Sequence, residues 1–110
     1  MADAEVRENV EKQRFEIWIG DERAGFTVYE GHGSTLSFVH TEIDPRFGGQ
    51  GLGSILIRQA LDSVRARDIA VLPFCPFVKA FIQKHPDYLG LVPAARRAAF
   101  GLPQSTPAES

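Results

Sequence analysis

The chain has 110 residues, which allows one domain with a single core and leaves little room for a separate substrate-binding lobe. Its composition is that of a folded globular protein, and a formal net charge of −2 favours neither nucleic acid nor an anionic membrane as a partner. No apolar run reaches the roughly 20 residues of a membrane span and Met1 to Gln13 is too polar for a signal peptide, so we expect a cytoplasmic protein.

The first half of the chain alternates apolar and polar residues in three segments, which predicts three strands. We expect them at residues 14–19, 24–29 and 35–43, with turns at Gly20-Asp21-Glu22 and Gly31-His32-Gly33. Turns this short force antiparallel neighbours, because a parallel return requires a crossover of a dozen or more residues. The first half is therefore predicted to be an antiparallel meander.

Beyond the third strand the apolar period changes to that of a helix, which we expect over residues 52–66 with Arg58 and Asp62 paired on its polar face. A continuous apolar run at 69–72 predicts a strand parallel to the third one. A second helix is expected over 76–85, because proline suits a first helical position. The order βββαβα makes the fold class α/β, a mixed sheet in which an antiparallel meander precedes a parallel βαβ unit.

The two ends of the chain lack a pattern that would form a core. Residues 1–13 are a polar N-terminal segment, the expected domain spans 14–92, and 93–110 form a C-terminal segment. Within this last segment 94–100 can form a short helix. From about 101 the Pro, Ser and Thr content predicts a disordered tail.

Four glycines, Gly48, Gly49, Gly51 and Gly53, fall within six residues between the third strand and the first helix. Glycines permit the positive φ angles of an anion-binding nest, and free amides at a helix N-terminus attract phosphate. A P-loop does not fit, because Ser54 stands where its lysine is required. The dinucleotide fingerprint fails as well, since it needs another glycine at position 54. We interpret the turn from Gly48 to Ser54 as a phosphate site, the alternative being a flexible connector.

The segment Ile43 to Gly53, with the sequence IDPRFGGQGLG, resembles the acetyl-CoA signature of the GNAT superfamily of N-acetyltransferases. In that signature a hydrophobic strand end precedes an Arg/Gln-x-x-Gly-x-Gly/Ala turn. Gly51 and Gly53 match its last two positions, whereas Gly48 stands where Arg or Gln is usual. Together with His40-Thr41-Glu42 and Cys75-Pro76-Phe77-Val78, the segment is similar to a group of very small GNAT-like proteins, and the resemblance covers about residues 14–92.

The resemblance implies a GNAT-like fold, acetyl-CoA as co-substrate and transfer of the acetyl group to an amine of a small molecule or a protein. It implies that pantetheine pairs with the backbone near Thr41 to Ile43 and that the turn holds the pyrophosphate. Among the basic residues that can neutralise the adenosine 3′-phosphate, only Arg46 is placed beside the turn by the sequence. The expected cofactor-binding residues are Thr41, Ile43, Arg46, Gly48, Gly49, Gln50, Gly51, Leu52, Gly53 and Ser54.

His40 and Glu42 are candidate catalytic residues. The two-residue alternation of a strand places both on one face with Leu36 and Phe38, roughly 7 Å apart. A general base for amine acetylation must accept a proton near neutral pH, and this favours His40 over Glu42. The alternative for each residue is a structural role in the sheet.

Cys75 is the only cysteine, which excludes an internal disulfide and a cysteine-based zinc site, and we expect no metal. It precedes Pro76, so its thiol is expected at a helix N-terminus and on the same side of the sheet as the glycine turn. It is an acetyl relay, a wall of the cofactor site or a packing residue. Because most GNAT enzymes are thought to use direct attack by the amine, direct transfer ranks above an acetyl-cysteine intermediate. The resemblance also makes Tyr88 a candidate donor to the departing thiolate.

The sequence therefore predicts an acetyl-CoA-dependent N-acetyltransferase. The competing hypotheses are a non-catalytic module that binds or senses acyl-CoA, and a structural interaction domain whose turn binds nothing. A short turn near Gly20 replaces the helices that full-size GNAT domains carry between their first strands, so we expect an open acceptor cleft. Such a cleft suits a bulky acceptor or a site completed by a second subunit, and we expect a monomer or a weak homodimer.

Overall fold

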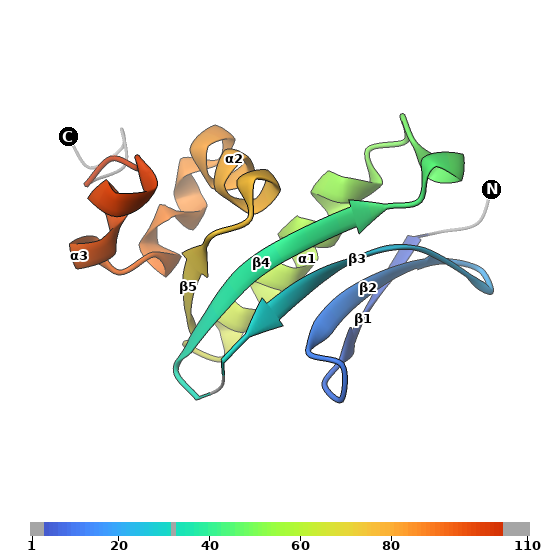
Figure 1. Ribbon diagram of the computed structural model, residues 1–110, viewed down its shortest axis with the longest axis horizontal. Coiled ribbons are helices and arrows are strands. Elements are labelled where there is room, and N and C mark those ends of the chain that lie inside the picture. Colours follow the sequence, from blue (N-terminus) through green and yellow to red (C-terminus); the bar gives the residue numbers. More distant parts are fainter. Residues whose placement is uncertain (1–3, 32, 105–110) are drawn as a thin grey trace.

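The computed structural model describes residues 4–31 and 33–104, so His32, expected in a loop, and the tail from 105 to 110 lie outside the described residues. Five strands form one sheet in chain order (Figure 1). The first four are antiparallel neighbours, and the fifth runs parallel to the fourth. This mixed sheet confirms the predicted fold class. The strands are β1 Ala4–Asn9, β2 Arg14–Ile19, β3 Glu22–Glu30, β4 Thr35–Ile43 and β5 Ala70–Pro73.

The helix expected over 52–66 is α1, Leu52–Ala66, and it packs across one face of the sheet against β1 to β4. We call this the inner face and the opposite one the outer face. The buried stripe of α1 includes Leu56, Ile57, Leu61 and Val64, each fully buried. The remaining helical segments are η1 Pro45–Phe47, α2 Pro76–Lys84, η2 Pro86–Leu91, α3 Ala94–Arg97 and η3 Ala98–Phe100.

The N-terminal segment, expected to lie outside the domain, contains the edge strand β1. Its inner face carries only Ala4 and Val6 as apolar residues, both partly buried against the core. The third inward position is Glu8, which accepts a 2.5 Å hydrogen bond from the Tyr29 hydroxyl and pairs with Arg67 at 3.3 Å. An acidic residue at an inward position breaks the apolar alternation, and for this reason the sequence pattern does not reveal the strand.

The C-terminal segment is also part of the folded unit as far as the structure describes it. Phe100 and Leu102 are buried, and the Phe100 ring meets Phe74 edge-on with 5.0 Å between centroids. The Leu102 amide donates to the Arg97 carbonyl at 2.9 Å. Two apolar side chains of this segment therefore bury their surface against the domain.

A β-bulge in β4 changes which side chains face the helix. Val28 lies opposite His40, but the next residue of β3, Tyr29, lies opposite Phe38, so Val39 is the extra residue. Phe38 points to the inner face, and its ring contacts Tyr29 with 6.0 Å between centroids. Beyond the bulge the alternation is shifted by one position. The expectation that His40 and Glu42 share a face with Leu36 and Phe38 is therefore wrong.

Replacing Gly25 by alanine tests the close approach of β3 and β4 at the strand ends. A Cβ at Gly25 would lie 2.5 Å from the Glu42 carbonyl oxygen and 2.5 Å from Cδ1 of Ile43, and a backbone oxygen cannot move aside freely. We expect Gly25→Ala to lower the free energy of unfolding by about 1–3 kcal/mol in urea denaturation. Gly90→Ala is the control, since its Cβ would meet no described atom within 4 Å. Equal stability of both variants would contradict this packing.

Candidate functional site

The glycine turn leads from η1 into α1 and is exposed from Gly48 to Gly51. Gly49 and Gly51 have φ angles of +79° and +72°, which side chains adopt only with strain. Gly51 is the N-cap of α1 and, having no side chain, leaves the first amides of the helix without a side-chain cap. An exposed helix N-terminus of this kind can accept a phosphate oxygen.

The strands β4 and β5 separate just before the turn. Their parallel pairing covers only Thr35 to Phe38 of β4, and a last contact joins the Cys75 amide to the Phe38 carbonyl at 2.8 Å. In Figure 1, β4 continues well beyond the end of β5. The Asp44 amide bonds to Ala24 on β3, so by alternation the amides of Thr41 and Ile43 point away from β3. No described strand pairs with that edge.

Thr41 and Cys75 meet on the inner face. The Thr41 hydroxyl lies 2.8 Å from the Thr27 hydroxyl and 3.3 Å from the Cys75 sulfur, and Thr27 is fully buried. Cys75 is the N-cap of α2, as expected, but only 3% of its surface is exposed. The thiol is therefore part of the packed junction between β4 and α2, and access to it requires local opening.

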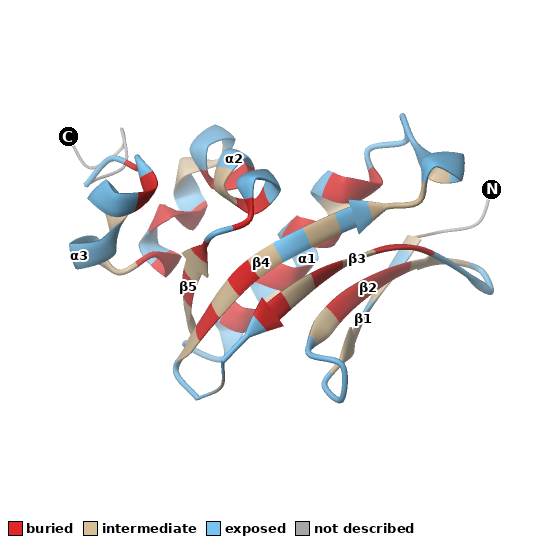
Figure 2. Cartoon of the chain, in the orientation of Figure 1, coloured by how far each residue is buried: buried red, intermediate tan, exposed pale blue. Residues whose placement is uncertain are grey.

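His40 and Glu42 lie together on the outer face. Nε2 of His40 is 3.2 Å from Oε1 of Glu42, and both side chains are more than half exposed. Both positions are exposed, and Figure 2 shows exposed segments in the later part of β4. Because neighbouring strand positions point to opposite faces, the three catalytic candidates divide into two groups. The outer pair cannot contact the Cys75 thiol through the strand, so His40 does not activate Cys75 as a base.

Arg46 follows the strand end, but its guanidinium is engaged there. It pairs with Asp44 at 3.1 Å and with Glu22 at 3.4 Å, and its hydrogen bonds hold the pKa of Asp44 below the ordinary range. Gln50 is exposed within the turn, whereas Leu52 is buried, so Leu52 can offer a ligand its backbone amide only. A Cβ on Gly53 would overlap the ring of Phe77, which fixes α2 against the start of α1.

Sequence reasoning missed Lys84 and the surface that it shares with the turn. A small cavity of about 110 Å³ lies between α1 and α2, and Ser54 lines it from α1. Its lining includes Ser54, Phe77, Ala80, Phe81, Lys84 and His85. The proximity of Lys84 depends on how the two helices pack, and no local pattern in the sequence reveals it.

Tyr88 lies away from the turn. Its hydroxyl donates to Asp62 at 2.7 Å and accepts from Arg58 at 3.3 Å, and burial followed by the Asp62 hydrogen bond raises its pKa. Asp62 is ten residues along α1 from Leu52, which corresponds to about 15 Å of helix. Asp62 pairs directly with Arg65 rather than Arg58. Tyr88 therefore joins η2 to α1 and is held by a carboxylate.

Two further arginines, Arg96 and Arg97, pack around the C-terminal segment. Arg97 donates to the carbonyls of Val92 and Gln104, and the Arg96 guanidinium lies 5.9 Å from the Phe100 ring centroid. Within residues 4–31 and 33–104, no group of three or more metal-ligating side chains is arranged to hold an ion. None of the helices in this part of the chain is both long enough and apolar enough to cross a membrane.

The chain belongs to the GCN5-related N-acetyltransferase family, whose model matches residues 14–91. The match includes β2 to β5, the glycine turn, α1 and α2. Family membership supports acetyl transfer as the general chemistry. A comparison with curated proteins finds no significant match.

Two solved structures are similar to this chain. A GCN5-like protein from Staphylococcus aureus, determined by NMR, superposes with a TM-score of 0.64 at 22% sequence identity over 84% of this chain and 91% of that one. The crystal structure of Ard1 from Thermoplasma volcanium gives a TM-score of 0.48 at 21% identity, over 56% of this chain and 43% of that one. The first likeness supports the fold, in agreement with the family match.

The burial of Cys75 predicts slow alkylation in the native protein. A thiolate attacks iodoacetamide only when the sulfur is accessible, and Cys75 reaches solvent only through local opening. We expect a rate roughly a hundredfold below that of the urea-unfolded chain. The measurement is mass spectrometry of a time course at constant pH. Equal rates in native and unfolded protein would contradict the packed position of the thiol.

Proposed function

We propose that the protein is an acetyl-CoA-dependent N-acetyltransferase that transfers the acetyl group to an amine by direct attack. The observation that carries the proposal is that two features which suit acetyl-CoA follow each other directly along the chain. The strand β4 offers an edge at Thr41 and Ile43 with which no strand of the described residues pairs, and the chain then passes through left-handed glycines into the N-terminus of α1. The family match, which includes both features, supports the same conclusion.

Three parts of this chain suit different groups of acetyl-CoA. The uncapped amides at the start of α1, with Gly49 and Gly51 in positive φ, suit the pyrophosphate. The free edge of Thr41 and Ile43 suits the amide groups of pantetheine, which can pair with it as a strand would. Lys84 provides a cation in the cavity that Ser54 also lines, and this cation can pair with a phosphate of the nucleotide.

In this proposal, the residues that take part in proton transfer lie on the outer face of the sheet. Acetyl-CoA supplies a thioester whose C–S bond is replaced by the C–N bond of the product amide, and the departing thiolate takes up one proton of the amine. The acceptor arrives as an ammonium and must first lose one proton, which the imidazole of His40 accepts. Glu42, 3.2 Å away, stabilises the resulting imidazolium.

Direct attack is favoured over an acetyl-cysteine relay by the position of Cys75. A relay needs an accessible thiol with a base beside it. Cys75 is nearly fully buried, its polar neighbour is the Thr41 hydroxyl, and His40 lies on the other face of β4. The thiol therefore serves as packing beside the site in this proposal.

Calorimetric titration with acetyl-CoA tests the binding step, with CoA and ATP as further ligands. We expect binding of acetyl-CoA without binding of ATP. Gly51→Glu places a negative charge where the pyrophosphate is proposed to lie, and like charges in contact repel each other. The affinity of this variant for acetyl-CoA should therefore fall roughly tenfold or more. Gly33→Glu is the matched control, because Gly33 has a similar φ of +80° and also has no described atom near its Cβ. Equal affinities of the two variants would exclude the turn as the phosphate site.

Variants at His40 and Cys75 test the route of transfer. We expect His40→Gln to lower kcat by roughly a hundredfold or more while acetyl-CoA affinity stays unchanged, because it removes a general base that does not hold the nucleotide. Cys75→Ala should retain most activity. An acetylated Cys75 that forms and decays at the rate of turnover would establish the relay instead. Normal acetyl-CoA binding without turnover on any amine would favour a non-catalytic acyl-CoA module.

A further inference from the structure

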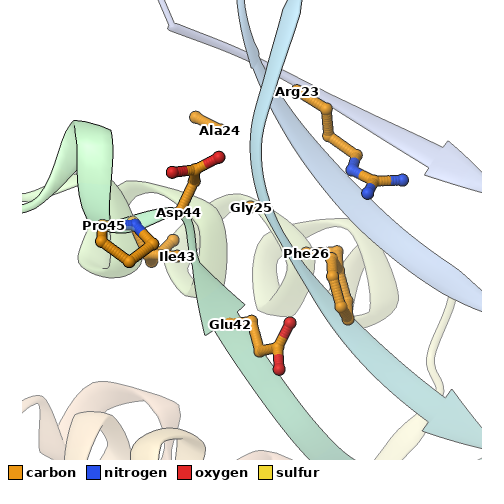
Figure 3. Close-up of a pocket in the computed structure, with 8 residues that line it drawn as sticks. All are labelled: Arg23, Ala24, Gly25, Phe26, Glu42, Ile43, Asp44 and Pro45. Atoms are coloured by element: carbon orange, nitrogen blue, oxygen red, sulfur yellow. The ribbon is translucent and has the colours of Figure 1, made fainter.

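A cavity of about 450 Å³ lies where β3 begins and β4 ends (Figure 3). Glu42, which pairs with His40, is one of its lining residues. Phe26 lies opposite Glu42 in the sheet, and both side chains belong to the outer face. The Arg23 guanidinium lies 5.4 Å from the centroid of the Phe26 ring. The cavity is lined by Arg23, Ala24, Gly25, Phe26, Glu42, Ile43, Asp44 and Pro45.

Some of the charged side chains around this cavity lack a partner of permanent opposite charge among the described residues. Asp44 is paired with Arg46, which leaves two other charges to consider. Among residues 4–31 and 33–104, Arg23 has no carboxylate within ion-pair distance. Glu42 pairs with His40, which is a cation only when protonated. The cavity therefore combines a free guanidinium with a carboxylate that has no permanent counter-ion.

We propose that this cavity is the acceptor site, and that the acceptor carries a carboxylate as well as its aliphatic amine, as an amino acid does. Arg23 binds the carboxylate, because a guanidinium presents two parallel donors to it. The Phe26 ring supports the methylene groups between the two charges. Glu42 holds the ammonium beside the imidazole of His40, which receives its proton. The inference rests on the proposed function, since it assigns the second substrate of the same reaction.

Other classes of amine fit these charges less well. A polyamine would place a second ammonium near Arg23, or near Arg14, whose guanidinium lies 4.9 Å from the same Phe26 ring. A neutral aromatic amine would leave Arg23 without a partner. Arg14 itself is already paired, at 2.7 Å, with the buried Glu16. Among the described residues of this surface, Arg23 is thus a cation that is available to a ligand.

Two probes that differ only in the carboxylate test the inference on the wild-type protein. Nα-acetyl-L-lysine has a free ε-amine and a carboxylate, and its methylamide has the amine alone. We expect NMR titrations without acetyl-CoA to give a dissociation constant roughly threefold to fivefold lower for the acid, and KM to show the same ratio, as for an exposed ion pair. Spermidine, which is an amine without a carboxylate, should bind no better than the methylamide.

Arg23→Gln should abolish the difference between the two probes, whereas Arg7→Gln should preserve it. Arg7 is the matched control, because its guanidinium also lies over an aromatic ring of this sheet, 5.0 Å from Trp18. Equal affinity of wild-type protein for both probes, or stronger binding of spermidine, would overturn the inference. Calorimetry with acetyl-CoA separates the two claims, since normal acetyl-CoA binding with no preference between the probes refutes only the acceptor assignment.

Discussion

The separation of β4 from β5 is the constraint on which the candidate site depends. Pairing ends at Phe38, and the extra residue Val39 then shifts the remaining part of β4 by one position. Without that residue His40 and Glu42 would point toward α1, where two ionisable side chains would lose their hydration without partners. With it, Thr41 and Ile43 face the helix, and the charged pair stays in water. In the proposed function, one strand therefore supplies a backbone edge for a ligand and side chains for proton transfer on its outer face.

The helix α1 connects the proposed phosphate site to the core of the fold. The same element buries its apolar stripe against four strands and presents its first amides to the exposed turn. Leu52 anchors the start of the helix in the core, and the Phe77 ring packs against Gly53 from α2. Amides held this way would need little reorganisation to bind an anion, because the packing of the core already orders them. The outer face, by contrast, is reached directly from solvent, since only the tight turn at Gly20 joins β2 to β3.

Elements with strong local patterns were predictable, and features produced by pairing or packing were not. The periodicity of α1 and the alternation of β2 and β4 gave their bounds, and the glycine spacing located the turn. The bulge at Val39 follows from the register between β3 and β4, which no single strand encodes. The same limit explains β1, whose inward Glu8 is satisfied by Tyr29 from another strand. Lys84 and Arg23 are candidates because of residues that are distant from them in sequence, namely Ser54 and Glu42 respectively.

Mapping of backbone amide shifts during an acetyl-CoA titration tests most directly whether the strand edge and the glycine turn form one binding site. In a ¹⁵N-labelled sample, the amides of Thr41 and Ile43 and those from Gly49 to Ser54 should shift together along one saturation curve, while those of β1 stay unchanged. Such a result would place the ligand along the free edge of β4 and at the N-terminus of α1. Saturable shifts confined to other parts of the sheet, with the turn unaffected, would contradict the proposed site, as would the absence of any shift.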